Sequence, residues 1–117
     1  METQFTDREV TYATALYAQM EKSGIPSHMR DALAEWILYH RPCGGFLQNL
    51  LANNLFETYA KADLENQRSI KEYIDFLYNH APSTCWGSPR KVADWCDEKY
   101  RNLLEPYNVR EALKDSQ

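Results

Sequence analysis

The chain has 117 residues, of which 44% are hydrophobic and 26% are charged, a composition typical of a single soluble globular domain. Its net charge of −4 at pH 7 disfavours general nucleic-acid binding, which requires a basic surface. No apolar run approaches the roughly 20 residues of a membrane-spanning helix. The opening METQFTDREV lacks the order of a signal peptide, and three cysteines are an odd set. We therefore expect an intracellular protein with reduced thiols.

The first predicted helix covers residues 5–24. Thr6 and Glu9 form a capping-box pattern at its start, and Gly24 suits the left-handed residue that ends a helix. Its predicted buried face consists of Val10, Ala13, Leu16, Tyr17 and Met20.

Helical periodicity predicts four more helices, over residues 25–42, 44–63, 63–82 and 88–106. Pro42, Pro82 and Pro106 end three of them, because proline cannot continue a helix. Ser88 and Pro89 form a strong helix-start signature. The predicted apolar faces include Leu33, Trp36, Ile37, Leu50, Leu51, Leu55, Ile70, Tyr73, Ile74, Leu77, Tyr78, Val92, Trp95, Cys96 and Leu103.

The last ten residues predict a short sixth helix, with Asn108 and Glu111 at capping positions and Val109 and Leu113 four residues apart. So short a segment is helical only if it docks on the body, and otherwise it frays. We expect an all-α fold in one compact domain over residues 1–117, made of five helices and a short C-terminal helix. Its core covers about residues 6–104, and residues 105–117 form the terminal helix or a frayed tail.

Metal and catalytic motifs are weak in this sequence. His40 and Cys43 make one close pair, but zinc usually takes two such pairs, and Cys96 falls on the apolar stripe of its predicted helix. Neither Cys43 nor Cys85 lies in a nucleophile-elbow motif, and no phosphate-binding loop is present. We expect no metal, no cofactor and no enzymatic activity.

Two stretches are candidate binding sites. In the first, His40 and Arg41 end one helix and Gly44 and Gly45 start the next, so that exposed backbone amides and an arginine could hold an anion. The alternative is a tight interhelical turn. Asn54, in the following helix, is unusual because asparagine competes for backbone hydrogen bonds.

The second stretch is TCWGSPRK. Trp86 precedes the helix cap and needs an acceptor for its indole N–H if it is buried. Arg90 and Lys91 lie in the first turn of the helix, where positive charge opposes the helix dipole, and this suggests an anionic partner.

Two blocks of the chain, residues 24–63 and 76–95, resemble a family of small proteins encoded by tailed bacteriophages and prophages. The shared motifs are an Ile-Pro-x-His-Met-Arg opening, a Gly-Phe-Leu helix start and a specific Phe-Leu-Tyr-Asn…Ala-Pro…Cys-Trp-Gly-Ser block. The likeness covers about residues 24–96. The chain departs from it with Asn53-Asn54-Leu55 in place of Asn-Asp-Leu, and with Cys43-Gly44 in place of Pro-Gly. The resemblance implies an accessory protein of the host cytoplasm and brings no activity with it.

These observations favour a non-enzymatic binding protein of a bacteriophage that acts on a host or phage protein. The aromatic content of 13%, with eight tyrosines, supports this view because surface aromatics mark contact sites. One alternative is a small-molecule or nucleotide binder that uses His28, Arg30, His40 and Arg41 with the Gly44-Gly45 helix start, or the Trp86–Lys91 turn. A second is nucleic-acid binding by a helix that carries Arg30, Arg41 or Arg90, and the net acidity argues against it. A homo-oligomer is a further alternative, because a small domain with surplus aromatic residues has apolar surface to cover.

Overall fold

Every regular element in residues 7–115, the part of the chain that this computed structural model describes, is helical. The α-helices are α1 (Asp7–Ser23), α2 (Arg30–Tyr39), α3 (Gly45–Leu51), α4 (Leu55–Lys61), α5 (Leu64–Arg68), α6 (Ile70–His80), α7 (Pro89–Trp95) and α8 (Pro106–Asp115). Three short 3₁₀ helices join them: η1 (Ser27–Met29), η2 (Ser83–Cys85) and η3 (Glu98–Leu103). The all-α class is therefore confirmed, whereas the predicted count of five helices and a terminal one was wrong.

The predicted helix over residues 44–63 is two helices, because the chain turns at Asn53 and Asn54. Asn53 adopts φ 64°, in the left-handed region that asparagine tolerates better than most residues. The Asn54 N–H donates to the Asn49 carbonyl at 2.9 Å, which closes the end of α3. The conformation of Asn53 and this hydrogen bond end α3, although apolar residues continue at helical spacing beyond it.

Two other predicted helices are also interrupted. The Asp63 side chain accepts a hydrogen bond from the Asn66 N–H and caps the five-residue α5, and Ser69 separates α5 from α6. Cys96 is extended, with φ −65° and ψ 135°, and Asp97 caps the following 3₁₀ helix by accepting from the Lys99 N–H. Aspartate that caps locally competes with continuation of a helix, and the break at Cys96 occurs next to such a residue, Asp97.

Several predicted helix ends are confirmed. Ser88 caps α7 by accepting from the Lys91 N–H, with Pro89 in the first turn, and Gly24 has φ 86° after α1. The second helix ends at Tyr39 and not at Pro42, because His40 adopts a left-handed conformation with φ 61°. The predicted capping box at Thr6 lies outside the described residues.

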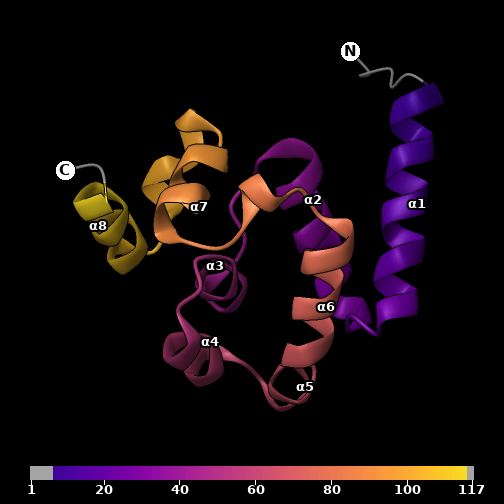
Figure 1. Cartoon of the computed structure of the whole chain (residues 1–117), viewed down its shortest axis with the longest axis horizontal. Coiled ribbons are helices and arrows are strands. Elements are labelled where there is room, and N and C mark those ends of the chain that lie inside the picture. The colour runs from indigo at the N-terminus through magenta and orange to yellow at the C-terminus, as the bar shows by residue number, and fades with distance from the viewer. Residues whose placement is uncertain (1–6, 116–117) are drawn as a thin grey trace.

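The core lies between α2, α3 and α6, with α1 against α6 at one end of the molecule and α7 with α8 at the other (Figure 1). Two indole N–H groups link α2 to η2 and α7. Trp36 donates to the Cys85 carbonyl at 3.0 Å, and Trp95 donates to the Trp36 carbonyl at 2.8 Å. Cys96 is buried, as its position on a packing face predicts. No helix of residues 7–115 is long and apolar enough to cross a bilayer.

The C-terminal segment is helical and docked, since α8 packs on α7 and buries Ala112. It starts at Pro106, so Asn108 lies inside the first turn, buried, and is not a cap. Gln48 holds the preceding connection, because its amide donates to the Leu103 carbonyl at 3.3 Å and accepts from the Glu105 N–H at 2.6 Å. The packing of α8 against α7, rather than the intrinsic helix propensity of so short a segment, stabilises this helix.

Candidate functional site

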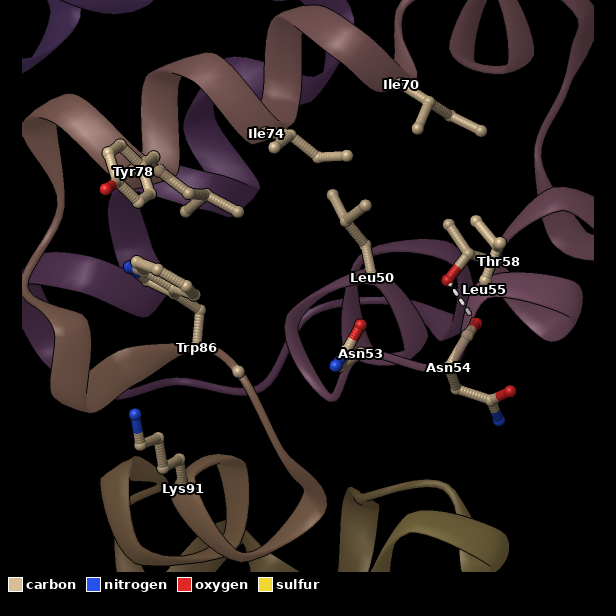
Figure 2. A pocket seen from close by; sticks show the side chains of 12 residues that line it. Leu50, Asn53, Asn54, Leu55, Thr58, Ile70, Ile74, Tyr78, Trp86 and Lys91 are labelled. Carbon is tan, nitrogen blue, oxygen red and sulfur yellow. Dashed lines mark hydrogen bonds between the residues drawn. The ribbon is translucent and has the colours of Figure 1, made fainter.

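An apolar cleft of about 390 Å³ opens beside α6, in the size range of ligand pockets in proteins. Figure 2 shows α6 on one side, the α3–α4 turn on another and the loop before α7 on a third. Its lining consists of Leu50, Asn53, Asn54, Leu55, Thr58, Ile70, Ile74, Leu77, Tyr78, Trp86, Gly87 and Lys91. We call this pocket the α6 cleft.

Helix α6 carries two apolar stripes. Tyr73, Phe76 and Leu77 are buried in the core, as predicted for Tyr73 and Leu77. Ile74 and Tyr78 are also on the predicted buried face, but they are 51% and 74% exposed and line the cleft instead. The prediction of burial was wrong for these two residues, because the apolar residues of α6 cover more of the helix than the core can contact.

The opposite wall is built on the turn between α3 and α4. The Asn54 side chain donates to Asn49 Oδ1 at 3.2 Å, and the Thr58 hydroxyl donates to the Asn54 carbonyl at 2.6 Å. The Asn54 amide points away from Ile70 and Ile74 in Figure 2. Its side chain therefore stabilises the turn, and the turn presents Leu55, predicted to be buried but 60% exposed, at the cleft.

Trp86 forms the third wall, between Tyr78 and Lys91 (Figure 2). Its ring lies 6.3 Å from the Tyr78 ring, and the Lys91 ammonium lies 5.9 Å from its centre. Gly87 fixes the loop, because its N–H donates to the Leu51 carbonyl at 2.7 Å while its backbone has φ 119°. The indole N–H of Trp86 is buried without a hydrogen-bond partner in the described residues.

Lys91 is the charged residue among those that line the cleft. Lys61, Lys71, Lys99 and Lys114 each lie within 4.0 Å of a carboxylate oxygen. Like Lys22, Lys91 has no carboxylate within that distance among the described residues, and its ammonium lies 5.9 Å from the centre of the Trp86 ring. The cleft therefore combines apolar walls with one cation that has no counterion.

His28 and Arg30 lie elsewhere. His28 Nε2 lies 3.2 Å from Asp63 Oδ2, and the Asn66 N–H, with His28 adding a smaller effect, holds the pKa of Asp63 below its usual value. The Arg30 guanidinium donates to the Ile25 carbonyl at 2.9 Å. Both side chains thus bind groups of the protein itself.

His40 and Arg41 also serve local structure. His40 stacks on Trp95 with ring centres 4.1 Å apart, and its Nδ1 donates to the Trp95 carbonyl at 2.7 Å. The Arg41 guanidinium lies 3.5 Å from Glu35 and 5.3 Å from the Tyr39 ring centre. Nothing in the sequence pattern predicts the contact of His40 with Trp95.

The Gly44-Gly45 turn is occupied by an ion pair. Gly44 precedes α3 with an extended backbone, and a Cβ on Gly45 would lie 2.9 Å from a carboxylate oxygen of Glu105. Glu105 in turn binds the Lys61 ammonium at 3.0 Å. A carboxylate at this helix start opposes a bound anion and favours the interpretation as a tight turn.

The remaining candidates are also separate from the cleft. Arg90 binds Asp94 one turn along α7 at 3.1 Å. Cys43 and Cys85 are buried, and burial raises the pKa of each thiol to about 12. Residues 7–115 contain no group of three or more histidine, cysteine, aspartate or glutamate residues able to hold a metal ion.

A second depression, of about 740 Å³, lies between α1 and α2. It is larger than the α6 cleft, but no charged residue and none of the predicted site residues line it. Tyr17 at its edge donates to Asp31 at 2.8 Å, and its pKa rises to about 12 through desolvation and this hydrogen bond. The α6 cleft is the better candidate because it alone of the two brings apolar and charged groups together.

The structure thus brings three of the predicted site residues, Asn54, Trp86 and Lys91, to one cleft. Comparison of the chain with protein-family models, curated proteins and solved structures finds no match. The assignment of the α6 cleft as the candidate site therefore depends on its lining residues and their contacts alone.

Proposed function

We propose that the protein is a non-enzymatic binding protein whose α6 cleft receives apolar side chains of a partner protein. The observation that carries this proposal is the exposure of Leu55, Ile74 and Tyr78 around one concave surface. Exposed apolar patches rimmed by polar groups mark protein–protein interaction sites and ligand-binding grooves. Covering one such side chain contributes on the order of 1.5–3 kcal/mol.

The cleft has the features of an interface centre. Trp86 and Tyr78 supply aromatic surface, and aromatic residues dominate the binding energy of most protein interfaces. The walls belong to α4, α6 and the Trp86 loop, each held by hydrogen bonds or core contacts. A preformed surface loses little entropy on binding, which favours affinity.

The proposed setting is that of a bacteriophage accessory protein that binds a host or phage protein in the host cytoplasm. Its support is the resemblance over residues 24–96, whose most specific block includes Trp86 and Gly87. The anion and nucleic-acid alternatives have less support, since Arg30, Arg41 and Arg90 each bind a separate group of this chain.

Site-specific photo-crosslinking tests the proposal. A benzophenone amino acid replaces Tyr78, which is 74% exposed in the cleft, or Lys71, an exposed residue of the same helix outside it. In phage-infected cells we expect one discrete crosslinked protein from position 78 and none from position 71. Excess wild-type protein removes this product, and I74D does not. Identical products from both positions, or none from position 78, contradict the proposal.

A further inference from the structure

We propose that the partner segment in the α6 cleft carries an anionic group beside its apolar side chains, and that Lys91 binds this anion. This inference rests on the proposed function, since it assigns the chemistry of the segment that fills the same cleft. The partner segment is an apolar stretch with an aspartate or glutamate next to its anchoring residues.

Charge complementarity is the first argument. The lining of the cleft includes a cation, Lys91, and no carboxylate. The other cation in the first turn of α7, Arg90, is neutralised by Asp94, whereas Lys91 has no such partner among the described residues. A lysine left without a counterion at the edge of an apolar surface favours a ligand that brings the negative charge.

The position of Lys91 is the second argument. Its ammonium lies over the Trp86 ring, at the end of the cleft away from Ile70 (Figure 2). Because Trp86 lies between Tyr78 and Lys91, a ligand whose apolar part covers Trp86 and extends past the edge of its ring would bring an adjacent carboxylate to the ammonium. Because Lys91 is exposed, solvent screens such a contact, and we expect it to contribute as an exposed ion pair does.

The extent of the apolar surface favours a protein segment as the ligand. The exposed apolar side chains continue past the cleft along α4, where Phe56 is 85% exposed and Tyr59 is also exposed. Phe56 lines a neighbouring depression that shares Asn54 with the cleft and whose charged lining is Glu57 and the Lys61–Glu105 ion pair, so the anionic group of the segment belongs at the Lys91 end. A small molecule inside 390 Å³ would leave this continuation uncovered, whereas a peptide segment can cover both parts.

Two dyes of the same scaffold test the charge requirement. 1-Anilinonaphthalene-8-sulfonate is an apolar anion, and N-phenyl-1-naphthylamine is its uncharged analogue; both fluoresce in apolar sites. We expect the wild-type protein to bind both dyes. K91M should weaken binding of the anionic dye by about fivefold, the upper range for an exposed ion pair, and leave the neutral dye unchanged. R90M is the matched control and should change neither affinity.

The possible outcomes separate the two proposals. Equal effects of K91M on both dyes, or no effect on the anionic dye, overturn the anion assignment and leave the apolar cleft in place. Failure of both dyes to bind the wild-type protein contradicts the cleft itself as a binding site. The peptide crosslinked at position 78 is the second test: it should contain aspartate or glutamate beside apolar residues, and a peptide without an acidic group overturns the inference.

Discussion

Single residues with unusual backbone conformations shape the cleft. Gly87 places the Trp86 wall, because a φ of 119° is accessible to glycine and because its N–H binds the end of α3. The composition of the Trp86 stretch predicts a turn and a cap, but it does not predict this hydrogen bond to Leu51. That contact depends on the packing of segments more than 30 residues apart in the chain.

The first prediction concerns Gly87. We expect G87A to lower the free energy of unfolding by about 1–3 kcal/mol, because the new side chain has space but the backbone is strained. Urea denaturation followed by circular dichroism measures this change. G44A is the matched control: Gly44, the N-cap of α3, has a negative φ and open space around it, so the loss should be at most about 1 kcal/mol, the difference between glycine and alanine at a helix N-cap. Equal losses would refute the role of φ.

The buried thiols give a prediction of pH dependence. Burial raises the pKa of Cys43 and Cys85 from about 9 to about 12, so the folded state keeps their protons when the unfolded chain loses them. Their contribution to stability is therefore complete below pH 9 and is lost between pH 9 and pH 12. Iodoacetamide at pH 8 should modify these thiols only in denaturant; rapid alkylation of the native protein would show that they are accessible.

At the scale of elements, the sequence predicts which segments are helical, but it does not predict where a helix is interrupted. Ser88 with Pro89 and Gly24 are local signals that specify helix ends without tertiary help. The break at Cys96 follows no helix-breaking residue, and it occurs where Asp97 donates its N–H to the His40 carbonyl at 2.8 Å. Long-range contacts of this kind are invisible to periodicity.

The break between α3 and α4 is directly testable. We expect N53A to lower the free energy of unfolding by about 1–2 kcal/mol, because Asn53 is exposed and its main constraint is φ 64°. N53G should leave stability close to that of the wild type, since glycine adopts positive φ freely. Thermal unfolding of both variants distinguishes them, and a stable N53A would mean that the turn does not require this conformation.

The two stripes of α6 predict opposite phenotypes. F76A should cost about 3–5 kcal/mol of stability, because Phe76 is fully buried. I74D should leave the melting temperature nearly unchanged and remove crosslinking at position 78, because Ile74 faces the cleft. If I74D unfolds the protein, α6 has one buried face and the cleft is part of the core.

At the scale of the whole molecule, the candidate site was only partly predictable. The local chemistry of Trp86 and Lys91 marks them as candidates in the sequence, and both line the cleft. The α6 wall was missed, because Ile74 and Tyr78 fit a helical apolar stripe as well as any core residue. The one available signal was the surplus of tyrosine, which predicts surface aromatics without placing them. The positively charged side chains of the other candidates, Arg30, Arg41 and Arg90, bind groups of this chain.

The affinity of the crosslinked partner for three forms of the protein tests the central claim most directly. Y78D changes the α6 cleft, and Y12D changes an exposed tyrosine in the depression between α1 and α2. With calorimetry on the purified partner, we predict that Y78D weakens binding by at least about 30-fold, as for an interface hot spot, and that Y12D binds like the wild type. Loss of binding in Y12D with full affinity in Y78D would contradict the account and assign the partner to the α1–α2 depression.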